Sequence, residues 1–274
     1  MTQTAAIYSK VGSLCVELPS PNSEVMPGVR WGAIDAFPTP AYWVYQVVHR
    51  RVSGGPPKYR LGRTLAEEVG ACLLGGHGIP AAVGLAAFEK LRAQGAFAEN
   101  APSLAQLLEW LTQPIMVGGK EVRYRFANQK SRYLAEALAA IRGAPAAPSG
   151  RALREWLREL PGIGYKTASW VARNWLDADD VAILDVHILR FGQAIGLFSS
   201  TLTVERHYLE LERLFLNLCY CIDVRPSELD AVVWHEMATS PLTVKKLMSE
   251  LKGVPAKVRP LRRATQADQQ LILV

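Results

Sequence analysis

Apolar residues recur at helical spacing through most of the chain, which predicts a mainly α-helical protein. In the stretch TLAEEVGACLL, which begins at Thr64, this spacing places Leu65, Val69, Cys72 and Leu73 on one helix face. The same pattern recurs in SLAQLLEWL (103–111), SRYLAEALAAI (131–141), RALREWLREL (151–160), KTASWVARNW (166–175) and VERHYLELERLFLNLCY (204–220).

Two of these helices carry a start signal in their first turn. Thr64 with Glu67, and Ser103 with Gln106, have the spacing of a capping box, so we expect helices to begin just after Thr64 and Ser103. Strand signals are sparse by comparison. The stretch AAIYSKVGSLCVEL (5–18) alternates weakly between apolar and polar positions and predicts one or two short strands near the N-terminus.

Length and composition are those of a globular protein. The chain has 274 residues, 49% hydrophobic and 20% charged, enough for one large domain or two lobes. The net charge is +6 and the sequence pI is about 9.2, which is compatible with a polyanionic partner such as nucleic acid. Many basic proteins bind no polyanion, so the charge alone does not select a function.

The N-terminus and the cysteines indicate a compartment. No basic segment followed by an apolar run opens the chain, and no apolar stretch approaches the ~20 residues of a membrane span, so we expect neither a signal peptide nor a membrane partner. Four cysteines in a chain of this length do not predict a secreted disulfide framework. The expected location is cytoplasmic, at the bacterial or archaeal nucleoid.

The segment LPGIG (160–164) separates two helical patterns. Gly162 and Gly164 permit a tight turn and leave the backbone bare, and the following helix offers unpaired N–H groups and the positive end of its dipole. Such a helix–hairpin–helix can bind one phosphate of a nucleic acid backbone through Gly162, Ile163 and Gly164. The alternative is an ordinary corner between two helices, and the five residues alone do not decide between them.

Two charged residues follow at suggestive positions. Lys166 lies in the first turn after the hairpin, and Asp185 lies inside the apolar stretch VAILDVHIL, where an acidic residue is costly without a partner. The intervening helix and the turn DADD (177–180) can return Asp185 towards Lys166. Taken singly, Lys166 is more simply a solvated lysine on a helix face, and Asp185 a helix cap. A P-loop is disfavoured, because Tyr165 stands where that motif needs glycine and a helix precedes the turn.

The segment from Leu160 to Gly196 resembles the helix–hairpin–helix (HhH-GPD) DNA glycosylases. The hairpin, the lysine behind it and the triplet DVH (185–187) are most similar to the 8-oxoguanine DNA glycosylase/AP lyase branch. The helical patterns from Thr64 to Gly196 fit the family's helical body, and ELDAVVWHEMATSP (228–241) resembles its closing helix. The first 60 residues and the last 20 resemble no family segment.

This resemblance implies a chemistry and an architecture. Lys166 would attack the sugar C1′ of a flipped nucleotide, Asp185 would stabilise the developing charge and assist proton transfer, and His187 would lie near a phosphate. We expect a two-lobed fold, with a helical domain at 63–195, a second lobe from 1–62 plus 196–274, and the active site in the cleft between them. The expected partner is double-stranded DNA carrying a modified base, bound by a monomer.

Several positions depart from the family or carry only tentative roles. Trp170 stands where the 8-oxoguanine enzymes of higher organisms have a cysteine that contacts the base, so it either lines the base pocket or belongs to the core. His77, in LLGGHGIP (73–80), matches the residue that fills the gap left by the flipped nucleotide, or else lies idle beside a glycine cap. Trp43 is a candidate for the pocket or for the core. Arg123, Arg125, Lys130 and Arg132 are candidates for phosphate contact or for a solvated surface.

The cysteine spacing argues against a cofactor. Cys219 and Cys221 have no later cysteines to complete the four thiolates of an iron–sulfur cluster, so no cluster and no other metal is expected, apart from an optional monovalent cation at the hairpin. The expected function is excision of a modified base in base excision repair, with 8-oxoguanine as the first candidate. The alternatives are excision of another base, including glucosylated hydroxymethylcytosine of bacteriophage DNA in anti-phage defence, and a non-catalytic DNA-binding module.

Overall fold

The computed structural model describes residues 1–274 with the exception of 10–11, 55–58, 77, 101, 145–146 and 252–274. Its described part is mainly α-helical, as the sequence predicts, with eleven helices. It also contains three short two-stranded antiparallel sheets, of which the sequence predicted only the first. Residue contacts divide the chain into two compact units. One comprises Met1–Pro57 and the segment that starts at Val181, and the other comprises Lys58–Asp180. By contacts the division thus falls before Val181, whereas the sequence placed it after Ile195.

The first unit combines the N-terminal sheets with the last helices of the chain. Its strands and helices are β1 (Gln3–Ser9), β2 (Gly12–Leu18), β3 (Glu24–Met26), β4 (Val29–Arg30), α1 (Pro40–Ser53), α8 (Val186–Ala194), α9 (Val204–Cys221), α10 (Pro226–Thr239) and α11 (Pro241–Leu251). Its core contains a row of aromatic rings, in which Phe191 of α8 lies 5.7 Å from Trp43 of α1 and 6.2 Å from Phe215 of α9, centroid to centroid. These edge-on contacts hold α8 against its neighbours.

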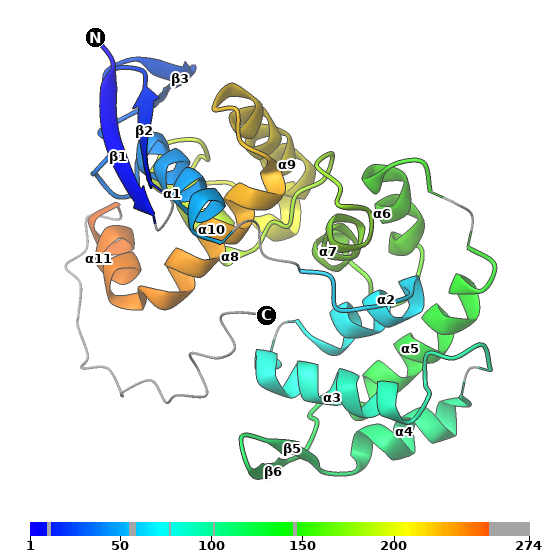
Figure 1. Ribbon diagram of the computed structural model, residues 1–274. Helices are drawn as coiled ribbons and strands as arrows, with labels where there is room; N and C mark the ends of the chain where they lie inside the picture. The colour runs from blue at the N-terminus through cyan, green and yellow to red at the C-terminus, as the bar shows by residue number, and fades with distance from the viewer. Residues whose placement is uncertain (10–11, 55–58, 77, 101, 145–146, 252–274) are drawn as a thin grey trace. The chain divides into compact units, whose positions relative to one another are not determined.

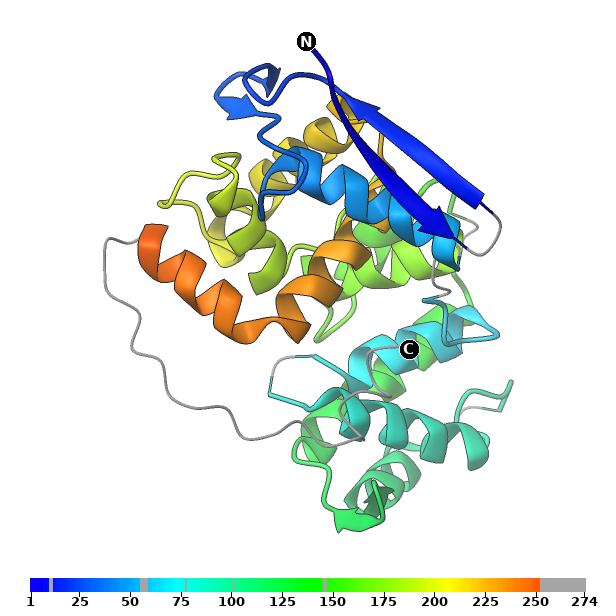
Figure 2. The same cartoon turned by 60° about the vertical axis from the view of Figure 1, so that its left-hand side comes forward.

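The weak alternation near the N-terminus does form two strands. β1 and β2 pair with Ala5 opposite Val16 and Gln3 opposite Leu18. Ile7, Val16 and Leu18 are buried on one face of the ribbon, and α1 lies beside it in both Figure 1 and Figure 2. A two-stranded ribbon is marginal on its own, so burial of this face against the helix stabilises it.

The second unit is a helical block with one β-hairpin. Its elements are α2 (Leu65–Leu74), α3 (Ala81–Ala93), α4 (Leu104–Thr112), β5 (Ile115–Val117), β6 (Lys120–Val122), α5 (Ala127–Ile141), α6 (Gly150–Arg158) and α7 (Tyr165–Leu176). α2 packs against α3, α5 and α7, and α6 packs against α7. The hairpin of β5 and β6 turns through Gly118 and Gly119, both at positive φ, and lies beside α3 (Figure 1).

A buried carboxylate ties together three parts of this unit. Glu68 of α2 has no exposed surface, and its Oε2 atom accepts hydrogen bonds from the N–H groups of Leu61 and Gly62, at 2.9 and 2.7 Å. Its Oε1 atom accepts one from Asn174 Nδ2 of α7, at 2.7 Å. Both oxygens of the buried group thus have partners, and α2 is joined to α7 and to the segment that enters the unit.

One of the two expected capping boxes is complete. Ser103 Oγ accepts from Gln106 N at 3.3 Å, and Gln106 Oε1 accepts in return from Ser103 N at 2.9 Å. At the start of α2 only half the box forms. Thr64 caps Glu67 N at 3.2 Å, but the Glu67 carboxylate accepts from Arg63 N, one residue earlier than the box requires.

Candidate functional site

The hairpin LPGIG turns between α6 and α7, as the sequence indicates. Gly162 has φ +77°, a conformation that favours glycine, and the ring of Tyr133 from α5 fills the space beside it. A Cβ added at Gly162 would lie 2.1 Å from Tyr133 Cδ2, so only a bare backbone fits there. Ile163 is buried at the corner, and its N–H donates to Leu160 O at 3.2 Å. The turn is therefore rigidly seated on α5.

The N-terminus of α7 is open beyond this corner. Gly164 is its N-cap with φ −89° and ψ 178°, and no side chain caps the helix there. The first N–H groups of a helix lack intrahelical partners, so this end can bind an anion, assisted by the helix dipole. Lys166 is the second residue of α7 and its side chain is exposed. An amine and an anion-binding backbone thus lie within one helical turn.

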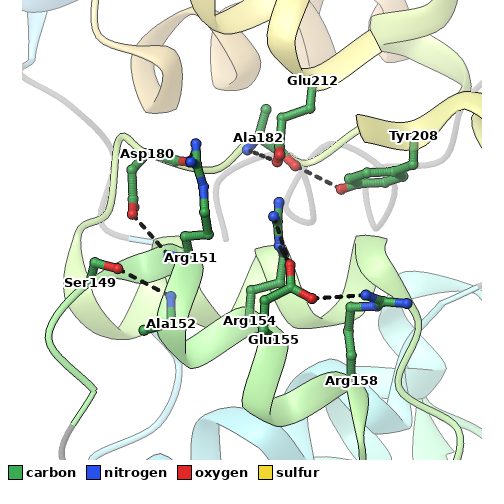
Figure 3. A network of polar contacts seen from close by, with 10 residues as sticks. All are labelled: Ser149, Arg151, Ala152, Arg154, Glu155, Arg158, Asp180, Ala182, Tyr208 and Glu212. Atoms are coloured by element: carbon green, nitrogen blue, oxygen red, sulfur yellow. Dashed lines mark hydrogen bonds and ion pairs between the residues drawn. The ribbon is translucent and has the colours of Figure 1, made fainter. Parts of the chain in front are cut away.

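Two arginines of α6 hold the first residue of α7. The guanidinium carbon of Arg158 lies 3.4 Å from the ring centroid of Tyr165, and that of Arg154 lies 5.5 Å from it. Glu155 accepts from both arginines, at 3.0 Å from Arg154 Nε and 2.8 Å from Arg158 (Figure 3). The two guanidinium groups clasp the aromatic ring through cation–π contact, which fixes the residue beside Lys166.

Asp185 is the N-cap of α8 in the first unit. Its Oδ1 atom accepts hydrogen bonds from the N–H groups of His187 and Ile188, at 2.8 and 3.0 Å. The sequence offered a helix cap as the alternative for this residue, and the structure confirms that cap. A cap occupies one carboxylate oxygen here and holds the side chain in a defined orientation, so it does not exclude a chemical role.

The segment before Asp185 is held by two polar side chains of α9. Tyr208 Oη donates to Ala182 O at 2.7 Å and accepts from Leu184 N at 3.2 Å. Glu212 accepts from Ala182 N at 2.9 Å (Figure 3). Residues 181–184 are buried and do not belong to a sheet. These side-chain hydrogen bonds therefore provide partners for backbone groups that would otherwise be buried without one. The position of Asp185 therefore depends on α9.

Sequence reasoning missed these supporting residues. The helical pattern of 204–220 places Tyr208 on the apolar face of α9 and assigns no role to its hydroxyl. The available signal was a tyrosine and a glutamate four residues apart on a buried helix face, since buried polar groups of this kind nearly always have partners. Tyr133 was not singled out at all, because no pattern linked it to the hairpin.

Trp170 lies on α7 one turn after Lys166 and is half-buried. Its Cη2 atom is 3.8 Å from the position that a Cβ would take on Gly75, the C-cap residue of α2. The glycine-rich segment after α2 therefore adjoins this ring. His77, the candidate for filling the gap in the duplex, lies outside the described residues.

The remaining candidates have clear local positions. His187 is the second residue of α8, and its side chain is half-buried. Trp43 is fully buried, and its Nε1 atom donates to Pro38 O at 2.9 Å. Its ring packs against Phe37 and Tyr42 as well as Phe191, so Trp43 lies in the core of the first unit.

The described residues contain no group of three or more metal-ligating side chains. Cys72 and Cys219 are buried, whereas Cys15 and Cys221 are exposed. Burial raises the pKa of the Cys72 thiol well above its usual range, and the adjacent Glu68 carboxylate acts in the same direction. Within the described part of the chain, no helix is both long and apolar enough to cross a membrane.

Comparison with known proteins gives a consistent result. The model of the Ogg-HhH family, described as 8-oxoguanine DNA glycosylase, matches residues 61–224. Proteins named 8-oxoguanine DNA glycosylase/AP lyase are 34% identical over 121 residues in Thermoplasma acidophilum and 36% identical over 122 residues in Metallosphaera sedula. These matches cover 43% and 42% of this chain, and 58% and 59% of the two relatives. The chain thus spans less than two thirds of the length of the curated relatives it matches.

A solved structure shares the fold. The Methanocaldococcus jannaschii 8-oxoguanine glycosylase/lyase, in complex with a 15mer DNA containing 8-oxoguanine, has a TM-score of 0.54 and 24% identity to this chain. The similarity covers 72% of this chain and 98% of that one. The family model matches more than half of the chain and includes the hairpin, Lys166 and Asp185. The chain therefore belongs to the Ogg-HhH family of 8-oxoguanine DNA glycosylases.

Proposed function

We propose that this protein is a DNA N-glycosylase with AP lyase activity that acts as a monomer on double-stranded DNA. The first candidate for its substrate is 8-oxoguanine. The observation that carries this proposal is the exposed amine of Lys166, one residue into the open N-terminus of α7 and inside the region that the family model matches. The relatives in Thermoplasma acidophilum and Metallosphaera sedula carry the same two activities in their names.

In this reaction the neutral amine of Lys166 attacks C1′ of the flipped nucleotide. The new C1′–N bond forms as the bond from C1′ to the base breaks, and the base leaves with the electron pair. Opening of the sugar ring turns the C1′–N bond into a protonated Schiff base. Loss of a proton from C2′ then expels the 3′-phosphate by β-elimination.

Asp185 and the phosphate-binding groups have distinct roles. The carboxylate of Asp185 stabilises the positive charge that develops on the sugar and takes part in proton transfer. The N–H groups of Gly162 and Gly164 and the side chain of His187 bind phosphates and position the strand, without reading its sequence. The N–H of Ile163 donates to Leu160 O, so this residue contributes the shape of the corner. The cap supports this role of Asp185, because two backbone N–H groups orient its carboxylate.

Borohydride trapping tests the nucleophile. Wild-type protein and a duplex containing 8-oxoguanine should become covalently linked on reduction, and Lys166→Gln should abolish the link. Lys120→Gln, an exposed lysine on β6 of the same unit, is the matched control and should trap like wild type. Equal base release by wild type and Lys166→Gln would refute the assignment of the nucleophile. If the protein binds duplexes but releases no base from any of them, it is a non-catalytic DNA-binding module.

Substitution of Asp185 separates its cap from its charge. Asparagine is an equally good N-cap, so Asp185→Asn should change the free energy of unfolding by only a few tenths of a kcal/mol. Base release should nevertheless slow roughly 100-fold or more, because the charge that stabilises the sugar cation is gone. If Asp185→Asn and wild type release base at the same rate, Asp185 acts only as a helix cap.

A second candidate substrate follows from Trp170. The large ring beside Gly75, one turn behind Lys166, differs from the cysteine that the related enzymes of higher organisms place there. Base release should therefore be compared on duplexes with 8-oxoguanine, on other modified bases, and on phage DNA carrying glucosylated hydroxymethylcytosine. Preferential release of the glucosylated base would assign the protein to anti-phage defence instead of base excision repair.

A further inference from the structure

Ten residues between β6 and the middle of α5 hold most of the chain's excess charge. The segment Arg123–Arg132, RYRFANQKSR, contains four basic residues and no acidic residue, whereas the whole chain has a net charge of +6. We call this segment the basic strip. Its basic residues are Arg123, Arg125, Lys130 and Arg132.

The first part of the basic strip is fastened to the last residue of α2 and adjoins the glycine-rich segment that follows this helix. Tyr124 is buried, and its hydroxyl donates to Leu74 O at 2.7 Å, the last carbonyl of α2. Its neighbours Arg123 and Arg125 are both exposed. The ring of Phe126 lies 3.6 Å from the position that a Cβ would take on Gly78. The buried tyrosine thus anchors two arginines beside this glycine-rich segment.

The second part of the basic strip leads to the hairpin corner. Lys130 and Arg132 lie in the early turns of α5, and the next residue is Tyr133, whose ring fills the space beside Gly162. Gln129 Nε2 donates to the hydroxyl of Tyr133 at 2.9 Å, which steadies that ring. One continuous segment of the second unit therefore connects the glycine-rich segment to LPGIG, through contacts made by Tyr124, Phe126 and Tyr133.

The charges of the basic strip are not neutralised within the described residues. Among the ion pairs found there, none involves these four residues, although Arg125 does lie 5.2 Å from the centroid of Phe126. Lys130 is half-buried, and desolvation by burial lowers the pKa of its amine. Holding an unpaired ammonium in a partly desolvated position costs free energy, and a bound anion would recover it.

We propose that the basic strip is a second DNA-backbone contact, in which Arg123, Arg125, Lys130 and Arg132 bind phosphates of the strand that the hairpin holds. This inference rests on the proposed function, since it takes DNA as the partner. It adds a surface that the hairpin alone does not provide. Phosphate contacts of this kind position the duplex and contribute affinity that depends on salt, but carry no sequence information.

The salt dependence of DNA binding measures these contacts directly. Each phosphate contact contributes about 0.9 to the slope of log K against log salt concentration, which amounts to roughly eightfold in affinity between 1 M and 0.1 M salt. The double variant Lys130→Gln/Arg132→Gln should therefore make this negative slope less steep by about 1.8 and raise Kd roughly 60-fold at 0.1 M salt. Arg123→Gln/Arg125→Gln should act similarly at the other end.

Fluorescence anisotropy with a duplex that carries a tetrahydrofuran abasic-site analogue provides the readout. The control is Arg142→Gln, an exposed arginine at the C-cap of the same helix and outside the basic strip, which should keep the wild-type slope. Glutamine retains much of each side chain, and circular dichroism of each variant should give a wild-type melting temperature. If one double variant has a lower melting temperature than wild type, the slope of the other double variant decides.

The two possible failures are distinguishable. If both double variants keep the wild-type slope while wild type binds in a salt-dependent manner, the basic strip does not contact DNA and the inference is overturned. If wild type fails to form a trapped Schiff base, the proposed chemistry is wrong, yet the comparison of slopes still decides whether the basic strip binds DNA. A reduced slope in the double variants, with an unchanged slope in Arg142→Gln, supports the inference.

Discussion

Replacement of Gly162 by alanine tests how the hairpin corner is built. Gly162 has φ +77°, and an alanine held in that region costs about 1 kcal/mol or more. The added Cβ would also lie 2.1 Å from Tyr133 Cδ2, whereas ordinary contacts begin near 3.4 Å. The tyrosine ring must therefore shift by more than 1 Å, which disturbs its hydrogen bond from Gln129.

The expected loss of stability follows from these contributions. Overpacking of this kind costs about 1–3 kcal/mol, and together with the backbone strain we expect a total near 3 kcal/mol. For a chain of this size, 1 kcal/mol corresponds to roughly 2–4 °C in Tm, so Gly162→Ala should melt roughly 6–12 °C below wild type. Thermal unfolding followed by circular dichroism measures this difference.

The same turn supplies its own control. Gly164 has φ −89°, and no heavy atom lies within 4 Å of the position that its Cβ would take. Gly164→Ala should therefore stay within about 1 kcal/mol of wild type. In a Tyr133→Ala background the clash is absent, so adding Gly162→Ala should cost only the backbone strain relative to Tyr133→Ala alone. If the two glycine variants melt at the same temperature, the corner is not seated on Tyr133 and the explanation given for Gly162 is wrong.

Three further predictions concern other parts of the molecule. Tyr208→Phe removes two buried hydrogen bonds from the segment that precedes the proposed catalytic carboxylate, so it should cost about 1–3 kcal/mol in urea unfolding and slow base release; an unchanged midpoint would contradict this. A thiol reagent should label Cys15 and Cys221 in the native state but not the buried Cys72, even at pH 9, because burial raises the pKa of that thiol; mass spectrometry of the labelled protein decides. Burial lowers the pKa of His235 below its ordinary 6.5, so its neutral form supports the fold above that pH and stability falls as the pH drops below it; His235→Gln should flatten this part of the pH profile of Tm.

Local patterns were sufficient for much of the secondary structure. Helices with a strong apolar stripe, such as α9, and starts with a capping residue, such as Ser103, follow from interactions between residues a few positions apart. The alternation at 5–18 likewise predicted β1 and β2. The start of α5 was missed by one turn: the helix begins at Ala127, four residues before the expected Ser131, because the polar residues 128–130 between them leave no apolar signal.

The main residues of the candidate site could also be predicted from the sequence. The spacing of LPGIG, Lys166 and Asp185 identified the family from the sequence, because the glycine turn, the lysine and the aspartate all lie within one short stretch, 160–185. The sequence also left Asp185 as either a cap or a catalytic group, and the cap is confirmed while its chemical role stays a prediction.

Only the tertiary structure revealed which residues support these groups. Tyr133 lies beside Gly162 although 29 positions separate them, and Tyr208 holds Leu184 and Ala182, before Asp185, from 24 and 26 positions away. Tyr124 likewise reaches Leu74 across 50 positions, which seats the basic strip beside the glycine-rich segment. Periodicity and capping act within a few residues along the chain, so the sequence by itself determined the helices and the reactive motif. The packing of side chains that are distant in sequence depends on how the helices meet, and that was decided only in the folded protein.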